Sequence, residues 1–116
     1  MHVVAAPDKF RGTASALEVA TAVERAVAEH GGTTAVLPMA DGGEGTLEAL
    51  GGSNQTSLVT GPLGGLIEAP WQLTGTTAII EMAKASGLMT IGGSEFNEVL
   101  DATSAGTGEL ILSAVE

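Results

Sequence analysis

The stretch TTAVLPMADGGEGTLEAL, residues 33–50, joins a short apolar run to a second apolar pattern through a glycine-rich turn. Residues 33–38 are typical of a short buried strand. Residues 44–50 predict a short helix that Gly51 and Gly52 end. A strand, a glycine turn and a helix in this order are typical of an α/β fold, in which such turns lie at the carboxyl ends of strands.

The residues before this stretch extend the pattern to a strand–helix–strand unit. The run HVVAA, residues 2–6, predicts a buried strand. Ser15 and Glu18 have the spacing of a capping box, so a helix should begin there and end at the two glycines 31–32. Two strands joined through a helix predict a right-handed βαβ unit with parallel strands. The buried face of the helix is expected from Leu17, Ala20, Val23 and Val27.

The residues after this stretch predict a different arrangement. Segments 55–60, 67–73 and 76–83 are rich in apolar or β-branched residues and predict strands, the first two joined by the turn GPLGG. The rest is expected to hold a helical turn at residues 83–88, a loop-rich segment at 90–108 and a last helix that opens at Gly108.

The composition bounds the size of the protein and its partners. The chain has 116 residues, which suits one small domain, and a formal charge of −10. Such a charge repels nucleic acids and anionic lipid surfaces, so neither is an expected partner. The charge fits either a cation partner or simple solubility. Aromatic residues make up 3%, so we expect a marginal core of Ala, Val, Leu and Ile.

Other classes of protein are excluded by what the sequence lacks. It has no cysteine, which excludes disulfides, zinc–thiolate sites and thiol nucleophiles. No apolar run approaches the ~20 residues of a membrane span. Residues 1–10 have no charged leader before their apolar stretch, unlike a signal peptide. The expected location is the cytoplasm.

Two glycine-rich turns follow the two predicted parallel strands and should meet at one edge of the sheet, where ligands of α/β proteins bind. Asp41 and Glu44 could hold a divalent metal ion or accept a proton from a hydroxyl, or they could simply cap the next helix. Lys9 and Arg11 are half of the 4 basic residues. Neither a P-loop nor a dinucleotide fingerprint is present. The residues expected to cluster at this edge are Asp8, Arg11, Asp41 and Glu44.

Two further patterns leave their roles open. Residues 103–110 form a third turn of small residues that enters a helix and could cradle a phosphate, although a flexible loop before a helix has the same pattern. Glu81 follows an apolar run and is either a site residue or a cap of the next turn. Neither pattern alone decides between a ligand site and an ordinary connection.

Five motifs, APDKFRGTASA, PMADGGEGT, TGPLGG, AIIEMAKASGL and TSAGTGELI, occur together in this chain. In this order and spacing they resemble the N-terminal part of the bacterial glycerate kinase family, and the resemblance covers essentially the whole chain. It implies ATP-dependent phosphorylation of glycerate to phosphoglycerate, commonly the 2-phosphate, with Mg²⁺. It also implies two α/β domains, one flavodoxin-like with a parallel sheet and the second inserted into it.

Family members are several times longer, so the resemblance implies a fragment, a truncated gene product or a deliberately cut piece. A division near residues 51–54 would then separate 1–52, the βαβ part of the flavodoxin-like domain, from 53–116, the start of the second α/β region. The expected fold class is therefore α/β, an incomplete two-domain fold.

The first motif matches the family with two departures. Asp8 and residues 10–12 match a D-x-F-[KR]-G turn. Lys9 stands where the family usually has serine, and Arg11 where it usually has lysine. The charge at position 11 is kept, but a guanidinium has a different geometry from an ammonium.

The later motifs match more closely. Residues 41–46 match without departure, and Glu81 matches the end of an E-M-A strand. In the T-x-x-G-T-G-E turn, Ala105 replaces a usual tyrosine. The matching residues of that turn are Thr103, Ser104, Gly106, Thr107, Gly108 and Glu109.

The resemblance implies catalytic roles for Asp41, Arg11 and Asp8. Asp41 would act as a base or as a ligand on the metal side, and Arg11 would neutralise the glycerate carboxylate or a nucleotide phosphate. Mg²⁺ would be held by Asp41 and Glu44. The implied substrate-binding or phosphate-binding residues are Lys9, Gly42, Gly43, Glu44, Thr46, Ser104, Gly106, Thr107 and Gly108, with Glu81 and Glu109 as other candidates.

Two other functions stay open. A non-catalytic remnant would bind a small anion or a partner chain, and an unrelated flavodoxin-like binding module is a weaker alternative. The 116 residues alone are expected to be inactive as a kinase, because in-line transfer needs two bound substrates in a cleft between two domains. Exposed apolar surface would then favour self-association.

Overall fold

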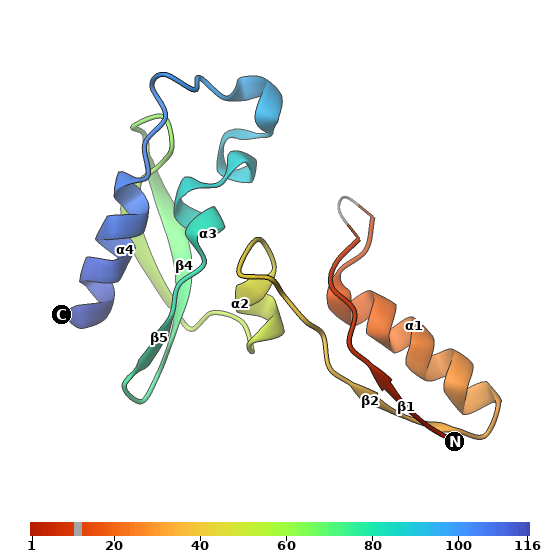
Figure 1. Ribbon diagram of the computed structural model, residues 1–116. Helices are drawn as coiled ribbons and strands as arrows, with labels where there is room; N and C mark the ends of the chain where they lie inside the picture. Colours follow the sequence, from red (N-terminus) through yellow and green to blue (C-terminus); the bar gives the residue numbers. More distant parts are fainter. Residues whose placement is uncertain (11–12) are drawn as a thin grey trace. The chain divides into compact units, whose positions relative to one another are not determined.

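The computed structural model describes residues 1–10 and 13–116 of the chain. These residues divide into two compact units, Met1–Leu50 and Gly51–Glu116, and each unit has a sheet of its own. The first sheet is parallel and the second antiparallel, so the protein is a mixed α/β protein (Figure 1). Among the described residues, no helix is long and apolar enough to cross a bilayer.

The first unit contains the predicted βαβ arrangement. Strand β1 (His2–Ala5) is followed by helix α1 (Ala16–Glu29) and strand β2 (Thr33–Val36), and β1 pairs with β2 in parallel. A short helix, α2 (Thr46–Ala49), completes the unit. Both strands and α2 are confirmed, although each is shorter than the sequence predicts.

Helix α1 begins and ends where its local signals predict. The Ser15 hydroxyl accepts a hydrogen bond from the Glu18 N–H at 3.2 Å, and the Glu18 carboxylate accepts one from the Ser15 N–H at 2.7 Å. This reciprocal pair is a capping box. The helix is followed by Gly31, whose φ of 70° suits glycine far better than other residues.

The buried face of α1 is narrower than expected. Ala20 and Val27 are buried, but Leu17 and Val23 are 57% and 36% exposed. The prediction that all four residues line a core is therefore wrong for two of them. The physical reason is the width of the sheet, since two strands about 5 Å apart cannot cover the whole apolar face of a helix.

The second unit is built on an antiparallel sheet. Its strands are β3 (Gln55–Thr60), β4 (Leu66–Thr74) and β5 (Thr77–Ile79), in the order β3-β4-β5. The predicted turn at residues 61–65 is confirmed. Because β3, β4 and β5 are joined by tight turns, they cannot be parallel neighbours, and the expected parallel sheet is limited to β1 and β2.

The strand predicted at residues 76–83 is only partly correct. β5 ends at Ile79, and helix α3 (Met82–Ser86) begins three residues later with Glu81 as its N-cap. Met, Ala and Lys are strong helix formers, which explains why the β-branched run does not extend through them. Two 3₁₀ turns follow, η1 (Leu88–Ile91) and η2 (Ser94–Phe96).

Helix α4 (Ala105–Val115) begins earlier than predicted. The sequence predicts its start at Gly108, and glycine in general disfavours a helix interior. The helix instead includes both Gly106 and Gly108. Its packing on the sheet outweighs their low helix propensity, as the contact between α4 and β3 shows.

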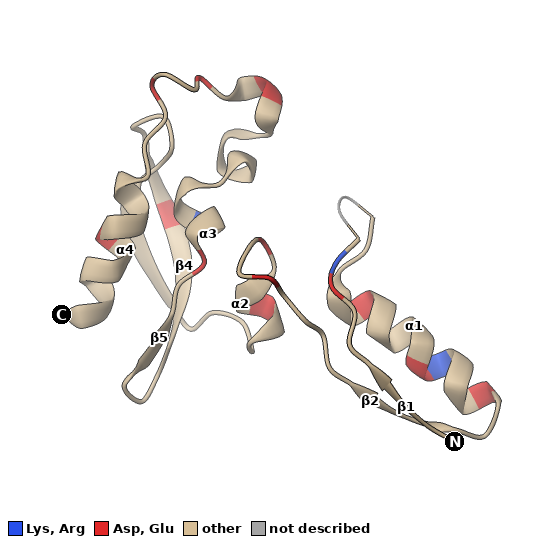
Figure 2. Cartoon of the chain, viewed as in Figure 1, with Lys and Arg blue, Asp and Glu red and all other residues tan. Residues whose placement is uncertain are grey.

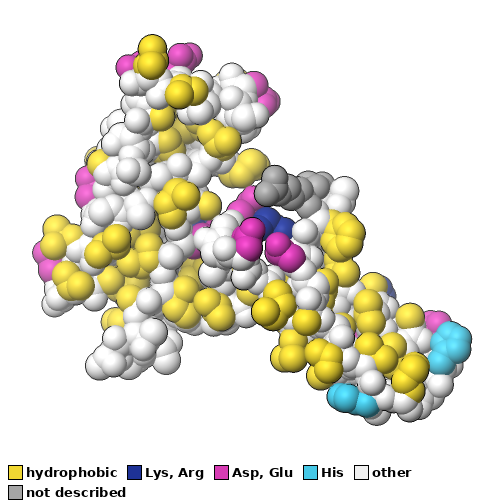
Figure 3. Space-filling model, viewed as in Figure 1, with side chains coloured by type: hydrophobic (Ala, Val, Ile, Leu, Met, Phe, Trp, Pro, Cys, Tyr) yellow, Lys and Arg dark blue, Asp and Glu magenta, His cyan; other side chains and the backbone are white. Residues whose placement is uncertain are grey.

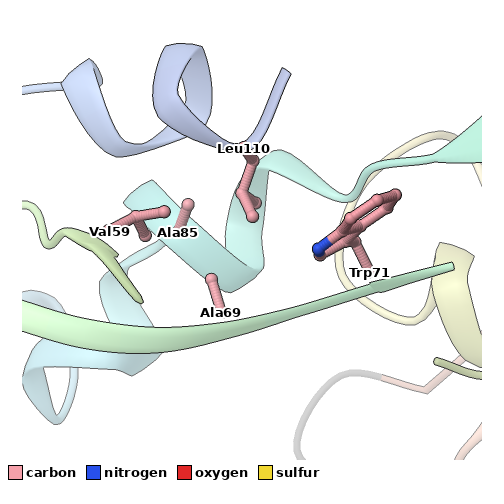
Figure 4. Packing of buried hydrophobic residues seen from close by; sticks show 5 residues of the cluster. All are labelled: Val59, Ala69, Trp71, Ala85 and Leu110. Carbon is pink, nitrogen blue, oxygen red and sulfur yellow. The ribbon is translucent and has the colours of Figure 1, made fainter. Parts of the chain in front are cut away.

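One core holds the second unit together (Figure 4). Trp71, the single tryptophan of the chain, belongs to it and donates a hydrogen bond from Nε1 to the Ser57 hydroxyl at 3.0 Å. The expectation of a core without aromatics is therefore wrong for this unit. The core residues come from β3, β4, α3 and α4 and are Val59, Ala69, Trp71, Ala85 and Leu110.

Helix α4 approaches the end of β3 so closely that a side chain at position 106 has no room. A Cβ added to Gly106 would overlap the carbonyl oxygen of Thr60. Three residues along the same helix, the Glu109 carboxylate accepts hydrogen bonds from the Thr60 N–H at 2.6 Å and from the Thr60 hydroxyl at 2.8 Å. Glycine and glutamate together fix α4 to the strand.

We expect Gly106→Ala to lower the free energy of unfolding by about 1–3 kcal/mol, the usual effect of forcing an extra methyl group into a packed contact. Gly108→Ala is the matched control, since position 108 is exposed and a Cβ there meets nothing within 4 Å. That change should raise stability by up to about 1 kcal/mol through helix propensity. Denaturant unfolding of both variants, followed by Trp71 fluorescence, measures the difference. Equal effects of the two substitutions would contradict the close approach.

Candidate functional site

The loops that follow β1 and β2 run side by side in the first unit. Backbone pairing continues beyond both strands, because the Leu37 N–H donates to the Ala5 carbonyl at 2.8 Å and the Met39 N–H donates to the Pro7 carbonyl at 2.9 Å. The two turns that begin after these residues therefore meet at one edge of the parallel sheet, as the sequence predicts. Figure 2 shows acidic residues on both loops and a basic residue on the first.

Three of the four residues predicted to cluster at this edge belong to the described part of the chain. Asp8 and Asp41 lie in the two neighbouring turns, and Glu44 lies three residues after Asp41. All three side chains are exposed. Arg11 and Gly12 fall outside the described residues, so the expected clustering of Arg11 with the three carboxylates stays a prediction.

The glycine turn between β2 and α2 is held by its own side chains. The Asp41 carboxylate accepts the Gly43 N–H at 3.0 Å, and the Thr46 hydroxyl donates to the Gly43 carbonyl at 2.6 Å. Gly42 and Gly45 have φ values of 91° and 94°, which only glycine adopts readily. Each of these glycines is therefore needed for the shape of the turn.

The ordinary explanation of the two carboxylates is that one of them caps the next helix. Neither is its N-cap residue, because the N-cap of α2 is Gly45, which has no side chain to make a capping hydrogen bond. The Gly43 N–H already donates to Asp41, so in this conformation it does not serve a ligand oxygen. Oxyanion binding by the backbone of this turn, as expected for Gly42 and Gly43, stays a prediction.

The turn that enters α4 in the second unit is tied into the fold at several points. The Thr103 hydroxyl accepts the Ala105 N–H at 3.1 Å, and the hydroxyls of Thr107 and Ser86 lie 2.8 Å apart. Ser104 is the N-cap but makes no capping hydrogen bond with its side chain. Of the candidates in this turn, Ser104 and Gly108 are exposed.

Ser86 was missed by the reasoning from sequence. It lies at the end of α3, and its hydroxyl fixes that of Thr107, a candidate for phosphate binding. Ser86 belongs to the motif AIIEMAKASGL, but nothing in the spacing of that motif points to it. A partner 21 residues away is visible only once α3 and α4 are packed together.

Glu81 is the one charged side chain among the described residues that is almost completely buried, at 1% exposure. Its backbone provides the N-cap of α3, but its side chain makes no capping hydrogen bond. The interpretation of its carboxylate as a cap is therefore wrong, and a role in a site stays a prediction. A carboxylate is therefore shielded from solvent at the junction between β5 and α3.

Within the described ranges, no group of three or more His, Cys, Asp or Glu side chains is arranged to hold a metal ion. Mg²⁺ usually takes one or two protein carboxylates and completes its shell with water and substrate phosphates. Asp41 and Glu44 are exposed carboxylates on one turn, so their chemistry fits such a site.

A groove of about 290 Å³ lies beside the start of α1. None of the predicted site residues that the structure describes lines it. The described walls are mostly apolar, and none of their side chains is a cation that could pair with a substrate acid. The lining residues are Phe10, Thr13, Ala14, Glu18, Val19 and Ala22.

Glu109 has a structural role in this arrangement. The hydrogen bond from the Thr60 N–H, followed by that from the Thr60 hydroxyl, holds the pKa of Glu109 below its ordinary value. Both bonds favour the ionised carboxylate. The sequence makes Glu109 a further candidate for substrate or phosphate binding, but its described contacts support a role in holding α4 against β3.

Comparison with known proteins identifies the relatives of this chain. Residues 3–116 match the glycerate kinase family. The chain belongs to this family. It is 45% identical to the glycerate 2-kinase of Escherichia coli (strain K12), and the match covers 100% of this chain and 32% of that protein. The glycerate kinase of Haemophilus influenzae matches with the same identity and coverage.

The relationship extends to a solved structure. A crystal structure from Salmonella typhimurium LT2, assigned as glycerate kinase 2, aligns with a TM-score of 0.77 and 44% sequence identity. The alignment covers 99% of this chain and 33% of that one. The chain thus spans about a third of the length of the relatives that it matches.

Stability should depend on pH through Glu109. Its lowered pKa means that its hydrogen bonds stabilise the fold above about pH 4.3, where glutamates of the unfolded chain titrate, and that this stabilisation is lost as pH falls through the folded-state pKa. Glu109→Gln has no titrating group. The difference in free energy of unfolding between wild type and variant should be largest near about pH 7 and shrink below about pH 4. A difference that stays constant over this range, measured by urea unfolding, would contradict the role of the ionised carboxylate.

Proposed function

We propose that this chain supplies part of an ATP-dependent kinase that phosphorylates glycerate, commonly to 2-phosphoglycerate. The observation that carries the proposal is the 45% identity, over the whole chain, to a protein named glycerate 2-kinase. Because the chain spans 32% of that protein, the complete reaction is proposed for an enzyme of the relatives' length. The residues of this chain contribute the parts described next.

Asp41 is proposed to accept the proton of the glycerate hydroxyl that attacks the phosphate. Its carboxylate is exposed, and the Gly43 N–H fixes it on the turn. Phosphoryl transfer requires mainly an oriented nucleophile and stabilised phosphate charge, so a positioned carboxylate is a suitable base. A ligand role on the metal side is the other proposed use of the same side chain.

The remaining charges serve the anionic groups of the two substrates. Arg11 would neutralise a carboxylate or a phosphate, and Asp8 lies in the same turn. Mg²⁺ would be held by Asp41 and Glu44, and when bound it neutralises charge on the phosphate oxygens. The proposal includes a cytoplasmic location, since ATP is supplied there.

The second candidate function is a non-catalytic protein that binds a small anion or a partner chain. Exposed apolar residues in the second unit favour it, because Val99 and Leu100 are 74% and 100% exposed. Exposed apolar surface of this kind is often covered by another chain. Activity measurements separate the two candidates.

The 116 residues alone should show no steady production of phosphoglycerate. Transfer in line needs both substrates held together with water excluded, and the chain covers only about a third of the length of the relative named glycerate 2-kinase. The test incubates the purified chain with ATP, Mg²⁺ and D-glycerate. Turnover above roughly 1 s⁻¹, an ordinary enzyme rate, would show that these residues carry a whole active site.

A chimera tests the kinase function itself. In it, these 116 residues replace the matching segment of the Escherichia coli glycerate 2-kinase, and the chimera should phosphorylate glycerate. Asp41→Asn should then lower kcat by on the order of 10²-fold, with little change in stability, because an asparagine side chain can still accept the Gly43 N–H.

Asp101→Asn, a change at an exposed loop residue of the second unit, is the matched control and should leave kcat unchanged. An active chimera whose Asp41→Asn variant turns over normally would remove Asp41 from the mechanism. A correctly folded but inactive chimera would count against the kinase function.

A further inference from the structure

Lys9 occupies a distinctive place at the edge of the parallel sheet. The Asp8 carboxylate accepts the Lys9 N–H at 2.7 Å, so the turn is fixed where the side chain leaves it. A Cβ added to Gly45 would lie 3.8 Å from the Lys9 Cδ, so the stem of Lys9 lies against the glycine turn. The side chain is half-buried. In the space-filling view, a basic side chain lies among acidic ones here (Figure 3).

The ammonium group of Lys9 has no described counter-charge. None of the described residues forms an ion pair with it, although Asp8, Asp41 and Glu44 lie on the same two turns. Half-burial of a lysine stem with an unpaired charge at its end leaves the ammonium available to an anion from solution. A Cβ at position 45 would make only ordinary van der Waals contact with this stem, so glycine is needed there for its φ of 94° and not for room.

Two of the backbone donors at this turn are already engaged. The Gly43 N–H donates to Asp41, and the Thr46 N–H donates to the Gly43 carbonyl at 3.2 Å. Helix α2 has only 4 residues, too few for a useful helix dipole. Of the other basic residues in the described part of the chain, Arg25 lies on α1 and Lys84 in the second unit.

We propose that Lys9 binds the oxyanion of a small-molecule substrate at this turn, and that it thereby helps to select anionic over neutral substrates. This inference rests on the proposed function, which supplies two sources of such an oxyanion, the glycerate carboxylate and the phosphates of ATP. The ammonium donates a hydrogen bond to an oxygen of the anion, and the aliphatic part of the Lys9 side chain lies against Gly45. No proton or group is transferred to Lys9.

The test measures binding to the 116-residue chain without turnover. Three probes are titrated, namely D-glycerate, inorganic tripolyphosphate and glycerol, and binding is followed by the NMR shifts of the Gly43 and Gly45 amides. One of the two anions should bind more tightly than glycerol, which has the hydroxyls but no charge. The anion that does so identifies the source.

Lys9→Met keeps the apolar stem against Gly45 and removes the charge. It should weaken binding of that anion about tenfold, the loss expected for one charge-assisted hydrogen bond, and leave glycerol unaffected. Lys9→Arg should retain most of the affinity. Arg25→Met is the matched control, since it removes one positive charge from α1 and should change the affinity less than about twofold.

Two results would overturn the inference. One is an anion that binds equally well to wild type and to Lys9→Met, and the other is no binding of either anion. Both leave the kinase proposal standing, because that proposal is decided by turnover of the chimera. An inactive chimera together with Lys9-dependent anion binding would support the inference about Lys9, contradict the kinase proposal and favour the anion-binding alternative.

Discussion

The second unit depends on the contact of α4 with the end of β3. Gly106 allows the backbones to approach, and the ionised carboxylate of Glu109 then satisfies both polar groups of Thr60. With the helix held at this distance, Leu110 reaches the core next to Val59 and Trp71. Residues 103–110 have the pattern of a ligand-binding loop, but in the structure Gly106 and Glu109 serve mainly to hold α4 against the sheet.

The turns of the first unit are stabilised by hydrogen bonds between residues close in sequence and not by the packing of a helix on a strand. Asp41 and Thr46 each bond to the Gly43 backbone, and Asp8 accepts the N–H of the next residue. Such short-range bonds hold a turn in shape without a large core behind it. The two acidic turns and Lys9 can therefore be presented by a sheet of only two strands.

Local signals predicted most of the elements, while long-range packing decided the rest. The capping box of Ser15 and Glu18 and the glycine after α1 are contained in a few adjacent residues, so the sequence alone reveals them. The start of α4 and the role of Glu109 depend on Thr60, 49 residues away. At the site, the parallel pairing of the two strands predicted that the two turns lie next to each other. The hydrogen bond between the Ser86 and Thr107 hydroxyls could not be predicted from the sequence.

The two glycines of α4 are under opposite steric constraints. Gly106 has no alternative, because the Thr60 carbonyl fills the space of a side chain. Gly108 faces open space, and in a helix interior a glycine is less stable than alanine by about 1 kcal/mol. Stability alone would let position 108 drift to alanine over time. Gly108 is therefore a residue that the helix itself disfavours and that the packing of α4 does not require.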